Sequence, residues 1–167
     1  MRYKILGLFA AVALLSACET ATTVGGTSGG SGGASTAKPQ QVASSATVVP
    51  GSQEDLVVSV GDSVYFDFNK FSLRADALNV LERQAAWLKS NASVTFSIEG
   101  HCDERGTREF NLALGERRAN AVKDYLVTLG INPVRIKTIS YGKERPVAMG
   151  SNNAAWAQNR RGVTKVN

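Results

Sequence analysis

Two residues of opposite charge, Asp103 and Arg118, are the side chains of this sequence best suited to chemistry. Asp103 follows an alternating apolar segment, and Arg118 lies on the helix expected to begin at Thr107. At about 100° per residue, Arg118 falls in the middle of an apolar helix face formed by Leu114, Ala121, Val122, Tyr125, Leu126 and Leu129. A guanidinium there is costly unless it is paired. We therefore expect Arg118 to emerge beside Asp103, at the carboxyl end of a strand, where sites in α/β sheets tend to form.

The pairing of Arg118 has several possible forms. Residue types alone also allow a plain internal salt bridge between Arg118 and Asp103, and this alternative stays open. Arg117 lies on the flank of the same helix face. Other carboxylates could take the place of Asp103, namely Glu104, Glu109 and Glu116.

His101 and Cys102 raise the possibilities of thiol catalysis and metal binding. Adjacent residues of a strand point to opposite faces, so this imidazole and thiol would not meet as base and nucleophile. Four consecutive residues of a regular strand, from His101 to Glu104, cannot surround one ion. We expect no catalytic residue, no metal and no cofactor, and a thiol enzyme using Cys102 stays only as an alternative.

The composition limits the class of protein. The chain has 167 residues, 43% of them hydrophobic, which is enough for one modest core and excludes a wholly disordered chain. Its 2 cysteines exclude a disulfide scaffold, and its lone histidine excludes a multi-histidine metal site. The net charge is +5, but the basic residues are spread out without aromatic interleaving. We therefore expect Arg160 and Arg161 to lie on a solvated face and no nucleic acid to be bound.

Residues 1–17 predict a secretory leader. Arg2 and Lys4 precede an uncharged apolar stretch, residues 5–15, that is too short to cross a bilayer core of about 30 Å. The stretch ends in Leu15-Ser16-Ala17-Cys18, which resembles the bacterial lipobox. That resemblance implies cleavage before Cys18, lipidation of Cys18 and stable anchoring by acyl chains. Glu19, in the second position, suggests export to the outer membrane.

The remainder of the chain divides into a tether and one domain. Residues 18–55 are rich in Gly, Ser and Thr, which predicts a flexible tether. In residues 56–167, alternation predicts strands over 56–60, 64–69, 94–98, 136–141 and 163–166. Helical spacing predicts a helix from a Ser72 cap to Ser90, one from Thr107 to Gly130, and a short one over 154–160. Strands alternating with helices predict a two-layer α/β sandwich.

The block from Glu99 to Ala119 resembles the signature of OmpA-like peptidoglycan-binding domains. Its Asp-Glu-Arg-Gly-Thr and Leu-Gly-Glu-Arg-Arg-Ala-Asn-Ala-Val segments are especially similar to the peptidoglycan-associated lipoproteins of that family. Residues 64–69, 140–146 and 159–161 match further blocks. The order and spacing of four blocks, with a lipobox and tether before them, make the resemblance specific. It implies the βαβαβ-type, two-layer fold of OmpA-like domains.

The resemblance implies that Asp103 and Arg118 hold the side-chain end of meso-diaminopimelate in the stem peptide of the cell wall. That end carries an ammonium and a carboxylate. An aspartate can accept from the ammonium, and both branches of an arginine fork can bind the carboxylate. Four further residues are expected to line or support the same pocket: Phe68, Asn69, Asn111 and Leu114.

The expected protein is thus a non-enzymatic lipoprotein of the outer membrane, facing the periplasm, that binds peptidoglycan. The resemblance also implies the Tol components, TolB above all, as partners, and a role in envelope integrity and cell division. Cys102 stands where such proteins often have Ala or Thr, and it leaves a free thiol once Cys18 is lipidated. Two alternatives remain, an OmpA-like wall-anchoring lipoprotein without Tol partners and a periplasmic thiol enzyme.

Overall fold

The computed structural model describes residues 48–167, so the predicted leader, Cys18 and most of the predicted tether lie outside the described residues. In chain order the elements are α1 (Gln53–Ser59), β1 (Ser63–Tyr65), α2 (Ala75–Ser90), β2 (Phe96–His101), α3 (Arg108–Thr128), the 3₁₀ turn η1 (Pro133–Arg135), β3 (Ile136–Gly142), α4 (Asn153–Asn159) and β4 (Arg161–Val166). Among these helices, none has the length and apolar character that crossing a membrane requires.

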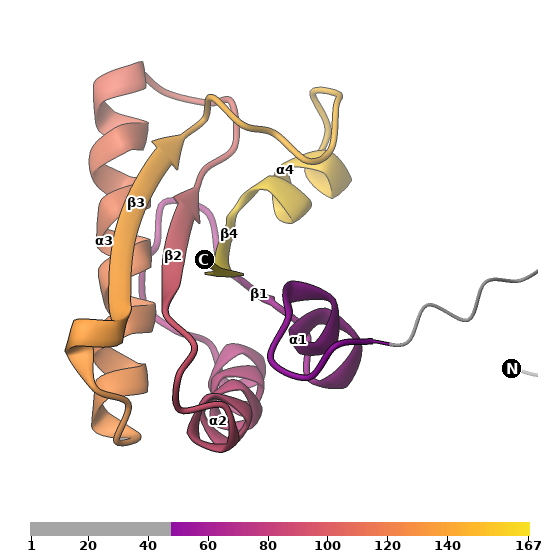
Figure 1. Ribbon diagram of the computed structural model, residues 1–167. Helices are drawn as coiled ribbons and strands as arrows, with labels where there is room; N and C mark the ends of the chain where they lie inside the picture. Colours follow the sequence, from indigo (N-terminus) through magenta and orange to yellow (C-terminus); the bar gives the residue numbers. More distant parts are fainter. Residues whose placement is uncertain (1–47) are drawn as a thin grey trace, which may run out of the picture. The chain divides into compact units, whose positions relative to one another are not determined.

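The four strands form one sheet in the order β1-β4-β2-β3. β2 and β3 are parallel, while β4 runs antiparallel to both β1 and β2. Parallel neighbours need a long crossover, and α3 supplies it, running beside β2 and β3 (Figure 1). The predicted two-layer α/β sandwich is confirmed.

The core lies between the sheet and the long helices α2 and α3. Phe96 and Ile98 of β2 are fully buried there, together with Leu81 and Leu88 of α2 and Leu126 of α3. These residues occupy the apolar positions that the strand and helix periodicities predict. The core thus fixes both long helices against the central strands. It thereby also fixes the points where the loops leave those strands.

Two local features hold the start of α3 close to the end of β2. Thr107 caps the helix as predicted, because its hydroxyl accepts from the Phe110 N–H at 3.2 Å. Gly100 of β2 faces Gly115 of α3 so closely that a Cβ on Gly100 would overlap the Gly115 carbonyl oxygen. Helix and strand therefore meet backbone to backbone, and residues just beyond β2 lie next to the first turns of α3.

The predicted strand over 56–60 is wrong, because these residues belong to α1 and the turn after it. Ser52 caps α1 by accepting from the Asp55 N–H at 3.2 Å, and the Asp55 carboxylate in turn accepts from Nε1 of Trp87 at 3.0 Å. Leu56 is buried, whereas Val58 of the supposed inward face is 74% exposed. Capping and tertiary contacts outweigh the β preference of a short valine-rich run. The expected domain boundary at residue 56 falls inside this helix.

The segment predicted as a strand over 64–69 is extended for only part of its length. β1 ends at Tyr65, and Phe68 is exposed rather than directed into the core. Asn69 has a φ of 55°, a left-handed conformation that ends the extended run. The predicted Ser72 cap is also wrong, since α2 begins after Arg74 without a side-chain cap.

Candidate functional site

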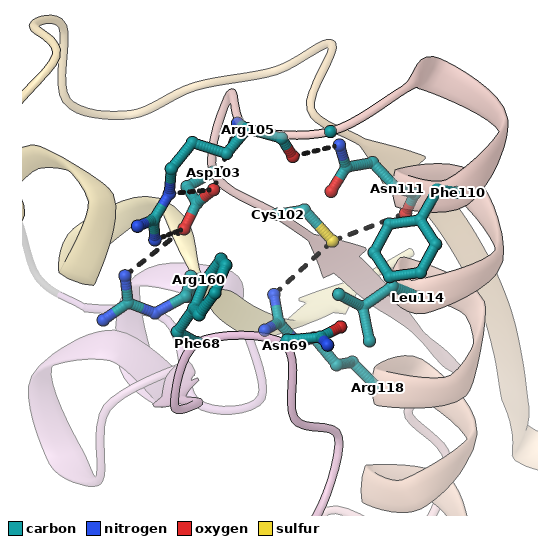
Figure 2. A pocket seen from close by; sticks show the side chains of 11 residues that line it. Phe68, Asn69, Cys102, Asp103, Arg105, Phe110, Asn111, Leu114, Arg118 and Arg160 are labelled. Atoms are coloured by element: carbon teal, nitrogen blue, oxygen red, sulfur yellow. Dashed lines mark hydrogen bonds and ion pairs between the residues drawn. The ribbon is translucent and has the colours of Figure 1, made fainter.

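A pocket of about 140 Å³ opens where β2 ends and α3 begins, with the loop after β1 as its third wall (Figure 2). Its lining residues are Phe68, Asn69, Cys102, Asp103, Arg105, Gly106, Phe110, Asn111, Leu114, Arg118 and Arg160. The structure thus brings together the six described residues that the sequence predicts for a single binding site. Cys18, predicted as the lipidation site, lies outside the described residues.

Asp103 is the one carboxylate of the pocket lining, and it is only 4% exposed. Its Oδ1 accepts from the backbone N–H of Arg105 at 3.2 Å and from Nε of Arg105 at 3.1 Å. Its Oδ2 accepts from Nη2 of Arg105 at 2.5 Å and from Nη1 of Arg160 at 3.3 Å. Burial raises the pKa of Asp103, but these hydrogen bonds outweigh it and hold the pKa below the ordinary 3.8. The carboxylate is charged at neutral pH, and its four lone-pair positions are all in use.

Arg118 is fully buried, as its place on the helix wheel predicts, and it bonds mainly to backbone carbonyls. Nε donates to the Lys70 carbonyl at 2.9 Å, and Nη2 to the Asp67 carbonyl at 3.1 Å. Nη1 donates to the His101 carbonyl at 2.7 Å and lies 3.4 Å from Sγ of Cys102. A guanidinium has five N–H groups, so one N–H of Nη2 is left without a partner among the described residues.

These bonds give Arg118 a second task in shaping the pocket. Asp67 and Lys70 flank Phe68 and Asn69 in the loop after β1, so Arg118 fastens both sides of the segment that carries two lining residues. The side chain therefore contributes a charge and also holds a wall in place. Removing Arg118 would release that wall together with the charge.

The pairing differs from the forms that the sequence suggested. In the described chain, Arg118 forms no salt bridge with Asp103, so that alternative is wrong, nor with the other carboxylates considered, Glu104, Glu109 and Glu116. The fork also does not keep both branches free for a ligand, since carbonyl oxygens occupy most of it. Backbone acceptors satisfy the N–H groups of the buried guanidinium without cancelling its positive charge.

Arg105, which the sequence interpretation missed, covers the Asp103 side of the pocket. Its guanidinium carbon lies 4.0 Å from the ring centre of Phe68 and 4.1 Å from that of Trp156. The Trp156 indole is itself held by Glu104, whose Oε1 accepts from Nε1 at 2.9 Å. The rings of Phe68 and Trp156 and the carboxylate of Asp103 therefore hold the Arg105 side chain in place. Arg105 follows Asp103 by two residues, and this short spacing was the signal that could have predicted their ion pair.

Arg160 corrects the prediction of a solvated basic face. Its side chain is only 16% exposed, because Nε donates to the Phe66 carbonyl at 2.9 Å and Nη1 to Asp103. Arg161 is half-buried in β4. Residues 159–161 match a block of the OmpA-like domains, and this match was the signal for a role of Arg160 in the site. The distribution of basic residues gave no such signal.

Asn111 and Leu114 support the pocket from the first turns of α3. Nδ2 of Asn111 donates to the carbonyls of Arg105 at 2.8 Å and Thr107 at 3.0 Å, so it fixes the loop between β2 and α3. Leu114 is 7% exposed and gives the wall opposite Asp103 an apolar surface (Figure 2).

The Cys102 thiol is a poor candidate for catalysis. Burial raises its pKa, so the group is a neutral thiol at neutral pH. Its Sγ donates to the Asn111 carbonyl at 3.4 Å and faces Arg118 on the other side. A buried thiol in these contacts acts as a small packing group.

The comparisons with known proteins agree with this geometry. The OmpA family model matches residues 65–160. A relative from Agrobacterium fabrum named peptidoglycan-associated lipoprotein is 55% identical over 122 residues, which cover 73% of this chain and 68% of the relative. The chain belongs to the OmpA family, and within it to the peptidoglycan-associated lipoproteins. The relatives are binding or structural proteins, and this membership therefore points to a non-enzymatic family.

Two solved structures have a fold similar to that of this chain. The crystal structure of the peptidoglycan-associated lipoprotein from Burkholderia pseudomallei has a TM-score of 0.62 and 44% identity, covering 64% of this chain and 90% of that one. The C-terminal domain of Helicobacter pylori MotB has a TM-score of 0.60 at 22% identity, covering 64% of this chain and 84% of that one. The second similarity concerns the fold alone. The OmpA-like fold predicted from the sequence is thus confirmed.

Proposed function

We propose that this chain binds peptidoglycan non-covalently through the side-chain end of meso-diaminopimelate. The observation that carries the proposal is the pocket at the end of β2, where Asp103 faces three guanidinium groups, those of Arg105, Arg118 and Arg160. A group with one ammonium and one carboxylate finds a receptor for each charge there. The names of the relatives, peptidoglycan-associated lipoproteins, support peptidoglycan as the ligand.

The ammonium of the ligand requires a rearrangement at Asp103. Because Arg105 and Arg160 already use all its lone-pair positions, an arriving ammonium takes the place of one of these donors. The guanidinium released in this way is then free to bind the carboxylate of the same ligand. The remaining N–H of Arg118 is a second donor for that carboxylate. The ligand thus exchanges one ion pair for two.

The sharpest test replaces Asp103, because its side chain bonds to Arg105 and Arg160 and does not fasten the loop after β1. Asp103→Asn keeps the shape and removes the charge. We expect the full-length chain, purified in detergent, to bind diaminopimelate-type sacculi about 10- to 100-fold more weakly after this change, as fits the loss of one hydrogen-bonded charge pair. Co-sedimentation over a range of sacculus concentrations measures the affinity.

The matched control is Asp124→Asn, which removes an exposed carboxylate from a later turn of α3. This control should sediment like the parent chain. Equal binding by the Asp103→Asn chain and its parent would rule out the pocket as the binding site.

We further propose that lipidated Cys18 anchors the chain in the outer membrane, with the domain in the periplasm, and that Tol components are its protein partners. The lipobox, the family and the names of the relatives support this assignment. A link between membrane and wall would serve envelope integrity and cell division. If the chain retains TolB in a pull-down from detergent extracts, it acts within the Tol system. If it binds sacculi without retaining TolB, it is a wall-anchoring lipoprotein of the same family without Tol partners.

A further inference from the structure

A second groove adjoins the pocket on the side away from Asp103. Its cavity of about 240 Å³ is lined by Asn69, Phe110, Ala113, Leu114 and Arg117. Three of these, Asn69, Phe110 and Leu114, also line the pocket and stand together along its wall in Figure 2. The two hollows therefore share a wall, and a ligand seated at Asp103 has this groove on the other side of Phe110 and Leu114.

The groove has an apolar floor and one positively charged side chain. Phe110 is 50% exposed and Ala113 is exposed beside it, so both present apolar surface to the groove. Arg117 is the only charged residue of the lining. A small apolar group next to an anion is the chemistry that this lining fits.

Arg117 keeps its charge available. Within residues 48–167 its guanidinium has no ion pair, and it lies 5.9 Å from the ring centre of Phe71. The helix positions three and four residues away, where a partner carboxylate would stand, carry no charge: Ala113, Leu114, Asn120 and Ala121. The cation at the groove is therefore not neutralised along its own helix.

We propose that this groove is a second subsite, which binds the D-alanine that follows diaminopimelate in the stem peptide and holds its free carboxylate on Arg117. The inference rests on the proposed function. With the tip of diaminopimelate at Asp103, its peptide-bonded end points out of the pocket. One further residue of extended chain spans about 3.5 Å, so a residue attached at that end reaches an adjoining groove. The methyl group of D-alanine suits Phe110 and Ala113, and its carboxylate suits a guanidinium.

The test compares two peptides that differ only in this carboxylate. They are L-Ala–γ-D-Glu–meso-diaminopimelate–D-Ala and the same tetrapeptide with a C-terminal amide. Isothermal titration of the full-length chain in detergent should show the free acid binding about threefold more tightly than the amide, the size expected of one exposed ion pair. In Arg117→Ala the two peptides should bind equally, at the affinity of the amide for the parent chain.

Arg83→Ala is the matched control, because it removes an exposed arginine from α2. It should keep the threefold preference, and Arg117→Lys should keep part of it. If the parent chain binds both peptides equally, the subsite is wrong while the proposed function stands. If it binds neither peptide, the proposed function itself fails. If Arg117→Ala retains the preference, or loses affinity for both peptides alike, Arg117 is not the carboxylate receptor.

Discussion

At the residue scale, Asp103 and Arg118 contribute to the pocket in different ways. Arg118 spends most of its hydrogen bonds on carbonyls of the loop after β1 and of β2. Asp103 bonds only to residues that line the pocket with it. Lost binding in an Arg118 variant would therefore mix a missing charge with a displaced loop, whereas Asp103→Asn leaves that loop fastened and removes the anion that Arg105 and Arg160 bind.

The helix periodicity was sufficient to predict that Arg118 is buried. It could not name the partners, because Lys70 and Asp67 are 48 and 51 residues away and offer only backbone oxygens. A backbone acceptor leaves no trace in residue types. The same reason hid Arg160, whose partners include the Phe66 carbonyl.

His101 gives a prediction about pH. Its ring is 2% exposed, and neither ring nitrogen has a hydrogen-bond partner in the described chain. Burial, followed by the charges of Arg161 and Arg145, lowers its pKa from 6.5 to about 4, and the Glu99 carboxylate at 3.7 Å from Nε2 does not offset this. Between these two pH values the unfolded chain binds a proton that the folded chain does not. The free energy of unfolding should therefore fall as the pH drops from 6.5 to 4, by at most about 3 kcal/mol.

Urea unfolding at pH 7 and at pH 4.5 measures this loss, which His101→Phe should remove. Because His101 is the only histidine of the sequence, its NMR titration reads the same quantity directly. A histidine signal that titrates near 6.5 in the folded chain would contradict the prediction.

At the scale of elements, contacts within one helix or strand were predictable and contacts between elements were not. The Thr107 cap and the span of α3 follow from local signals. The helix α1 does not, because the hydrogen bond between Asp55 and Trp87 joins residues 32 positions apart. The order of strands, with β4 between β1 and β2, likewise depends on pairing between distant segments.

The contact between β2 and α3 gives a second prediction. Gly100→Ala places a methyl group on the backbone of Gly115, which cannot move without shifting the helix. We expect a loss of about 3 kcal/mol or more in the free energy of unfolding, at the upper end for overpacking. Gly61→Ala is the matched control. Gly61 has a φ of 83° and open space around it, so only backbone strain of about 1–2 kcal/mol is expected there.

Urea midpoints at unchanged slope give both values. Equal losses in the two variants would mean that α3 and β2 do not touch as closely as described.

At the scale of the whole molecule, the sequence predicts an anchored domain, and the described residues account for the domain alone. The apolar core, the sheet and the pocket all lie within residues 48–167. All lining residues of the pocket lie within the described domain, so the proposed binding of the wall needs no residue of the anchor. Anchoring and wall binding should therefore be separable.

Cys18→Ser tests this separation. We expect the variant to lose incorporation of labelled palmitate and to move from the membrane fraction to the soluble periplasmic fraction, because no acyl chain is attached. Its affinity for sacculi should stay within about twofold of the parent. A variant that stays in the membrane fraction would contradict anchoring through Cys18.

The proposed binding mode makes the site selective, because the carboxylate of Asp103 is already crowded by two guanidinium groups. A simple amine, such as a lysine side chain, would have to displace a guanidinium and leave it with no anion nearby. A molecule that carries its own carboxylate next to its ammonium avoids that loss. We therefore expect the domain to discriminate against walls whose stem peptides contain lysine in the third position, although lysine and diaminopimelate differ by a single carboxyl group.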